Sequence, residues 1–260
     1  MQDRHSNKQQ YFEEQALTTK KFVIPYLADL LKITSETEVL EVGCAEAGNL
    51  KPFLDLGCKC TGIDISCGRI DLANKFYENH PQNNNLTLIC EDIYNVDPEG
   101  KKYDLIFMRD VIEHIPNQEK FMGFAKKFLK DDGKFFLAFP PWQNPFGGHQ
   151  QITRSNLLSK LPYFHLFPTS AYKFILKAFG EKPNRIADLL EIKTTGISIE
   201  RFERILKKEN YHIQKRTFYL INPNYETKFK LKPRQQNSFI AAIPGLRNFF
   251  TTAMYYVVSK

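Results

Sequence analysis

The 260-residue sequence has no long apolar run: nowhere do roughly 18 apolar residues stand together, as a membrane-spanning helix requires. Its first ten residues, MQDRHSNKQQ, are polar and lack the apolar centre of a secretory signal peptide. No tract is biased enough in composition to predict disorder. These absences favour a soluble, globular protein that is not exported, and we expect a cytoplasmic location.

Cysteine is scarce and unpatterned. The five cysteines form neither an even set nor a Cys-x-x-Cys pair: Cys44, Cys58, Cys60, Cys67 and Cys90. Such an arrangement predicts neither a disulfide framework nor a zinc site, and it favours a reducing compartment. We also find no other pattern of metal ligands, so the sequence predicts no metal.

Charge is distributed unevenly along the chain, whose net charge is +7. Residues 1–150 carry 17 Lys and Arg against 22 Asp and Glu, whereas residues 151–260 carry 19 against 7. A basic second part with many Phe and Tyr residues could attract an acidic substrate, an anionic lipid surface or nucleic acid. It could equally be a solvated surface, because charged runs usually are.

Short apolar runs alternate with helical patterns, which is typical of βαβ units and a parallel sheet. We expect strands at Glu38–Val42, Lys59–Asp64, Leu86–Cys90, Tyr103–Phe107 and Gly133–Phe139. Helices are expected between them, at Asn49–Leu56, Gly68–Asn79 and Gln118–Leu129. A helical lead-in, kinked at Pro25, precedes the first strand.

After the fifth strand the rhythm breaks, and a Pro/Gly loop is followed by three amphipathic stretches that predict helices: Arg154–Leu161, Ser170–Phe179 and Asn184–Leu190. A helix at Ile199–Glu209 and strands at Tyr211–Ile221 and Thr252–Val258 then resume the α/β pattern. We therefore predict one domain made of a lead-in (1–36), a ligand-binding core (37–141), a helical cap over the carboxyl edge of the sheet (142–198) and closing elements (199–260).

Three acidic residues fall at or near the ends of successive strands. Glu41 lies in VLEVGCAEAGNL, residues 39–50, where a strand runs into a loop of small residues. Asp64 ends the second strand in TGIDIS, and Asp92 follows the third in CEDI. Small residues let a ligand approach the backbone, and an acid at the end of the second strand can accept hydrogen bonds from ribose hydroxyls. The pattern predicts a nucleoside-containing ligand.

In these segments, and in YDLIFMRDVIEHI at residues 103–115, the chain resembles the class I S-adenosylmethionine-dependent methyltransferases, especially the small-molecule branch similar to quinone-biosynthesis enzymes. The resemblance implies a Rossmann-like sheet of seven strands, mostly parallel with the last antiparallel, and S-adenosyl-L-methionine as cofactor. It implies cofactor contacts from Glu41, Gly43, Cys44, Ala45, Gly48, Asp64, Ile65, Asp92, Ile93 and Arg109. The sequence departs from the family at Ala45 and Ala47, where glycine is usual.

Two histidines are candidates for the catalytic base that a hydroxyl acceptor would need: His149, which we prefer, in the loop FGGHQQ, and His114 after the fourth strand. We expect O- or C-methylation of a small or lipid-like acceptor, which can be anionic, and no nucleic-acid partner. The basic second part could also give peripheral contact with a membrane. Two alternatives stay open: a nicotinamide-dependent Rossmann enzyme, and a non-catalytic binding protein of the same fold.

Overall fold

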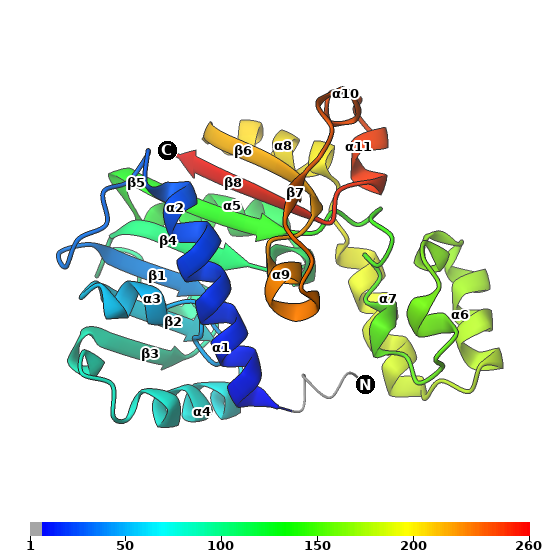
Figure 1. Ribbon diagram of the computed structural model, residues 1–260, viewed down its shortest axis with the longest axis horizontal. Coiled ribbons are helices and arrows are strands. Elements are labelled where there is room, and N and C mark those ends of the chain that lie inside the picture. The colour runs from blue at the N-terminus through cyan, green and yellow to red at the C-terminus, as the bar shows by residue number, and fades with distance from the viewer. Residues whose placement is uncertain (1–6) are drawn as a thin grey trace.

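The computed structural model describes residues 7–260 and contains a single twisted sheet with helices on both faces (Figure 1). The strands are β1 (Glu38–Val42), β2 (Lys59–Asp64), β3 (Leu86–Cys90), β4 (Tyr103–Arg109), β5 (Leu129–Phe139), β6 (His212–Ile221), β7 (Arg234–Gln235) and β8 (Ala253–Ser259). Their spatial order is β3-β2-β1-β4-β5-β8-β6-β7. Strands β1 to β5 pair in parallel, and β8 runs antiparallel to β5 and β6. The predicted fold class is confirmed.

The sheet has eight strands rather than the seven predicted. The additional strand, β7, has only two residues, lies at the edge of the sheet and pairs antiparallel with β6. Two residues are too few to show the alternation of apolar and polar side chains that identifies a strand in a sequence.

The helices are α1 (Lys8–Thr18), α2 (Ile24–Leu27), α3 (Lys51–Asp55), α4 (Cys67–Tyr77), α5 (Gln118–Ala125), α6 (Thr169–Ala178), α7 (Pro183–Thr195), α8 (Ile199–Lys208), α9 (Asn224–Phe229), α10 (Ser238–Ala241) and α11 (Leu246–Phe249). A π-helical turn, η2 (Thr19–Val23), joins α1 to α2 near the predicted kink at Pro25. In the described residues, no helix is both long and apolar enough to cross a membrane.

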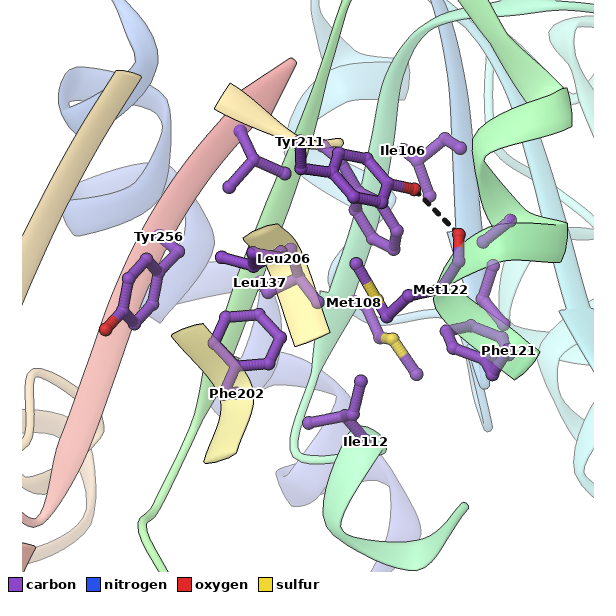
Figure 2. Close-up of a cluster of buried hydrophobic side chains, with 14 of the residues drawn as sticks. Ile106, Met108, Ile112, Phe121, Met122, Leu137, Phe202, Leu206, Tyr211 and Tyr256 are labelled. Atoms are coloured by element: carbon purple, nitrogen blue, oxygen red, sulfur yellow. Dashed lines mark hydrogen bonds between the residues drawn. The ribbon is translucent and has the colours of Figure 1, made fainter. Parts of the chain in front are cut away.

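Each face of the sheet has its own core. Successive residues of a strand point to opposite faces; thus Leu105 and Phe107 pack with α1, α3 and α4, and Ile106 and Met108 pack with α5 and α8. Figure 2 shows the second core, in which Phe202 and Leu206 of α8 meet the sheet and Tyr211 donates a hydrogen bond to the carbonyl of Met122, at 2.9 Å. The two packed faces fix the strand ends that carry the candidate site.

The cap has a small core of its own, made of the buried side chains Leu158, Phe164, Tyr172, Leu176, Ile186 and Leu189. Helices α6 and α7 lie beyond the carboxyl ends of the parallel strands (Figure 1). The chain enters and leaves this segment at one point, because the Trp142 amide donates to the Ile197 carbonyl at 2.8 Å.

The helix expected at Arg154–Leu161 is wrong: only a 3-10 turn, Leu158–Lys160, forms there. The amides of Arg154 and Ser155 donate instead to the carboxylate of Glu181, at 2.5 and 3.3 Å. This partner lies 26 or more residues away along the chain, so a local helical pattern does not register it. The other two cap helices form close to the predicted positions.

The expectation of no disulfide is also wrong, because Cys67 and Cys90 are bonded, while Cys44, Cys58 and Cys60 are free and buried. Cys67 begins α4 just after β2, and Cys90 ends the neighbouring strand β3, opposite Asp64. Strand pairing brings the two together, which counting cysteines could not show.

Candidate active site

The loop after β1 has a backbone suited to close approach of a ligand. Gly43, Ala45 and Ala47 all have left-handed φ angles, of 69°, 51° and 59°. A β-carbon on Gly43 would lie 2.7 Å from a methyl of Val111, and one on Gly48 would lie 2.6 Å from the Phe12 carbonyl oxygen. The left-handed conformation explains the family's preference for glycine at positions 45 and 47, where alanine carries a cost of roughly 1 kcal/mol.

Asp64 joins this loop to the start of α4. Its Oδ2 accepts a hydrogen bond from the Ala45 amide and its Oδ1 one from the Ser66 amide, both at 2.8 Å. A carboxylate offers about four lone-pair positions, so two remain for further donors. Asp64 therefore holds the loop after β1 against the start of α4 and keeps accepting capacity for a ligand.

Deeper in the site lie two buried charged side chains, Glu41 and Arg109, which are 1% and 8% exposed. Asn49 donates to Glu41 Oε1 at 2.6 Å, while Glu41 Oε2 has no hydrogen-bond partner among the described residues. The same holds for Nε and Nη1 of Arg109. Burial raises the pKa of Glu41 to about 8, against the opposing effects of the Asn49 hydrogen bond and the Arg109 charge. Buried, unsatisfied groups of both signs fit a ligand that carries an ammonium and a carboxylate.

The remaining predicted cofactor residues lie at the same edge of the sheet, but not all present a side chain. Cys44 is fully buried, and Ile93 belongs to the core on the α5 and α8 side, so only their backbones are available. Ile65 is 78% exposed directly after β2. Asp92 is exposed and its Oδ1 accepts from the Tyr94 amide at 3.0 Å, which leaves its other oxygen available.

Helix α1 covers this edge, which the sequence did not indicate. Phe12 stacks on Phe76 and Tyr77 of the α4 region, with ring centroids 4.9 and 5.5 Å apart, and Lys8 forms a 2.8 Å ion pair with the buried Glu46. Burial, with the Asp110 charge next, raises the pKa of Tyr11 to about 12. The lead-in helix is therefore part of the wall of the site.

His114 and His149 meet although 35 residues separate them, with ring centroids 5.0 Å apart. His114 ends a 3-10 turn after β4 (Ile112–His114), and partial loss of hydration lowers its pKa from the usual value. A lowered pKa keeps imidazole neutral at pH 7 and able to accept a proton. The carboxylate of Glu113 lies nearby: one ligand atom from each of Glu113, His114 and His149 lies within 4.8 Å of the other two.

The loop that carries His149 is held from several sides. The Asn144 side chain donates to the Pro141 carbonyl at 2.6 Å and accepts from the Phe146 amide at 2.9 Å. A β-carbon on Gly148 would lie 2.2 Å from Cβ of His165. His149 itself has a left-handed φ of 53°, a sparsely populated conformation for a non-glycine residue. The loop thus fixes one imidazole position at the edge of the sheet.

Four residues of the site were not predicted from the sequence: Asn49, Tyr11, Glu46 and Glu113. Asn49 follows Gly48 directly, so its place at the start of the turn was a usable signal. Tyr11 and Glu46 depend on how α1 packs, and Glu113 depends on which side of a three-residue turn faces inward. None of these follows from local periodicity.

The family model described as "Methyltransferase domain" matches residues 12–180, so the chain belongs to this family. The sequence is 24% identical over 112 residues to a sterol 4-C-methyltransferase of Caenorhabditis elegans, covering 43% of this chain and 34% of that protein. It is 31% identical over 106 residues to a ubiquinone biosynthesis O-methyltransferase of Bartonella tribocorum, covering 39% and 40%. The chain thus spans less than half the length of these two relatives.

Solved structures show the same fold. A geranyl diphosphate C-methyltransferase from Streptomyces coelicolor aligns with a TM-score of 0.57 at 10% identity, over 90% of this chain and 77% of that one. A putative sarcosine dimethylglycine methyltransferase from Galdieria sulphuraria aligns with a TM-score of 0.60 at 14% identity, over 93% and 84%. The resemblance to class I methyltransferases is confirmed.

The pKa of Glu41 gives the first prediction. Because its pKa is about 8 in the folded chain and near 4.5 in the unfolded one, the native state binds the extra proton between these values. This contribution to the free energy of unfolding is complete below about pH 4.5 and falls by up to about 1.4 kcal/mol per pH unit toward pH 8. Glu41→Gln, which keeps an oxygen for Asn49, removes that slope. Urea unfolding of the ligand-free proteins between pH 5 and 8 checks it, and parallel pH profiles would contradict it.

Proposed function

We propose that the protein transfers the methyl group of S-adenosylmethionine to a small or lipid-like acceptor, by O- or C-methylation. The observation that carries the proposal is the Asp64 carboxylate at the carboxyl end of β2, held by two backbone amides with accepting capacity left. The cofactor supplies an activated methyl group when bound. This proposal takes precedence over a nicotinamide enzyme, because Glu41 places a buried acid in β1 near Arg109, and both side chains have buried polar atoms without a hydrogen-bond partner among the described residues.

Different residues at the carboxyl edge of the sheet would contact different parts of the cofactor. Asp64 would accept the ribose hydroxyls, and Asp92 would lie on the adenine side with the exposed Ile65. Glu41 and Arg109 would hold the ammonium and carboxylate of the amino-acid end, since each has an unpartnered polar atom in a buried setting. Backbone amides of the loop through Gly43 and Gly48 complete the set.

The acceptor would lie on the other side, between the His149 loop and the cap formed by residues 142–198. Helix α7 reaches this place, because the buried Gln118, just after the His114 turn, donates to the carbonyls of Ile112 and Thr195. Orienting the acceptor and excluding water are what the protein must add to a donor that is already activated. His114 and His149 would face the accepting atom, with His149 the preferred proton acceptor.

Asp64 provides the direct test of cofactor binding. Asp64→Ala should weaken S-adenosylhomocysteine binding by roughly 1.5 to 3 kcal/mol, about 10- to 150-fold, because a charged acceptor is lost. Asp71→Ala, on the exposed face of α4, should change nothing and serves as the control. Titration calorimetry measures both. If the wild-type protein does not bind at millimolar ligand, the proposal fails; if Asp64→Ala binds equally well, Asp64 acts only as a cap.

His149 tests the acceptor side. His149→Gln should lower turnover about 100-fold or more while leaving S-adenosylhomocysteine affinity nearly unchanged, because the imidazole serves the acceptor and not the cofactor. The exposed His212, on β6, gives the matched control His212→Gln. Kinetics with an acceptor found by screening hydroxylated and isoprenoid compounds would measure it. Normal turnover in the variant would remove His149 from the mechanism.

We further propose peripheral contact with an anionic membrane through the cap, which suits a lipid-like, negatively charged acceptor. Helix α6 exposes Phe174, at 72%, between the exposed Lys173 and Lys177, and the neighbouring segments expose Leu157 and Phe167. Aromatic side chains flanked by lysines match the chemistry of an anionic lipid surface. No nucleic-acid partner is proposed.

Co-sedimentation with vesicles tests this contact. Binding to vesicles of phosphatidylglycerol and phosphatidylcholine should fall several-fold in Phe174→Ser, since less apolar surface would enter the interface. Leu56→Ser, at another exposed apolar residue directly after α3, should bind like the wild type. Equal loss in both variants, or no binding by the wild type, would contradict the contact.

A cytoplasmic location also remains a proposal. Three free, buried thiols, Cys44, Cys58 and Cys60, fit a reducing compartment, and the Cys67–Cys90 disulfide counts against it.

A further inference from the structure

The turn after β4 contains a buried carboxylate, that of Glu113. It is 5% exposed, and neither of its oxygens has a hydrogen-bond partner among the described residues. An unpaired buried carboxyl group costs several kcal/mol, so its presence calls for a partner that the polypeptide does not supply.

Two imidazoles stand beside this carboxylate. The ligand atoms of Glu113, His114 and His149 all lie within 4.8 Å of one another. Ligands about 2.1 Å from a common ion lie roughly 3 to 4 Å apart, so closing the set needs side-chain shifts of about 1 Å. His114 is exposed and can make that shift, whereas Glu113 is held by the turn and His149 by its loop.

The surrounding charges favour a cation. Asp110 and Glu191 of α7 both act on His114 as negative charges, and Arg69 at the start of α4 is the opposing positive charge. Asp110 has a left-handed φ of 56°, which marks the bend where β4 enters the turn. Two acids, one directly after β4 and one in the cap, therefore add negative charge near His114.

We propose that Glu113, His114 and His149 bind one divalent cation of the zinc type, with an open position directed at the acceptor. Imidazole and carboxylate ligands suit Zn²⁺, and three protein ligands with a free position are typical of catalytic rather than structural sites. Neither the cysteine pattern nor the spacing of ligands in the sequence shows this site, because the turn after β4 and the loop after β5 meet only in the fold.

The ion's role rests on the proposed methyl transfer. It would bind an oxygen of the acceptor, which narrows the acceptor class to molecules with a hydroxyl, phenol or similar oxygen next to the accepting atom. For a hydroxyl acceptor, Glu113, His114 and His149 would hold the ion, and the ion would polarise the acceptor's oxygen so that its proton passes to water. That oxygen would then form a bond to the methyl carbon while the bond from this carbon to the sulfur of the cofactor breaks, with S-adenosylhomocysteine as the leaving group. In this arrangement His149 would bind the metal rather than accept the proton. The His149→Gln variant should still lose turnover, because it would lose a metal ligand.

Binding of Zn²⁺ by tag-free protein, stripped with a chelator, tests the site. Equilibrium dialysis with elemental analysis should give one Zn²⁺ per wild-type chain and per His212→Gln chain. Glu113→Gln, His114→Gln and His149→Gln should each bind about tenfold more weakly or worse. His114 is exposed, so its variant remains informative even if the Glu113 variant unfolds. A Co²⁺ absorption spectrum that His114→Gln abolishes would support the same ligands.

Absence of stoichiometric Zn²⁺, or equal binding by all variants, overturns the inference. Calorimetry with S-adenosylhomocysteine separates this from the proposed function: cofactor binding without the metal leaves methyl transfer standing and removes the ion. Metal binding without cofactor binding would support the metal site and contradict the proposed methyl transfer.

Discussion

The carboxylate of Asp64 fixes the geometry on which the site depends. Its two oxygens accept the amides of Ala45 and Ser66, so the loop after β1 and the start of α4 are held around one negative charge. Because β1 lies between β2 and β4 in the sheet, this loop sits where the strand order changes direction. A crevice at that position is where open α/β sheets bind ligands.

Buried polar atoms without hydrogen-bond partners indicate which ligands the site suits. Glu41 and Arg109 are buried in one part of it, and Glu113 is buried in another, each with unpartnered polar atoms. Such groups reduce the stability of the empty protein, since desolvation is not repaid. A zwitterionic cofactor would supply partners for Glu41 and Arg109, and a cation would supply one for Glu113. Removing the desolvation penalty of these groups would favour binding of both ligands. His149 and Ala45 also have strained, left-handed backbone conformations, and strain of this kind is common at ligand-binding sites.

Much of the core could be predicted from sequence because each strand is a short apolar run and each is followed by a helical pattern. The five parallel strands and α4, α5, α6 and α8 lie close to their predicted positions. What failed depends on contacts between distant segments. The Arg154 amide bonds to Glu181 where a helix was predicted, and strand pairing brings Cys67 to Cys90. Helix α1 packs over the loop at Gly48.

The same division holds for the site. Asp64 could be predicted because strand ends share one edge of a parallel sheet, and the left-handed φ angles at Ala45 and Ala47 now account for the family's glycines there. The meeting of Glu113 with His114 and His149 could not, since periodicity does not specify where a loop after one strand places its side chains relative to the turn after another.

A crystal structure of the protein with S-adenosylhomocysteine tests the central claim most directly. The account predicts both ribose hydroxyls within about 2.5 to 3.0 Å of the Asp64 carboxylate, while Ala45 and Ser66 keep their hydrogen bonds to it. The amino-acid end should reach Glu41 and Arg109. A nucleoside bound elsewhere, or one whose ribose makes no contact with Asp64, would contradict the account.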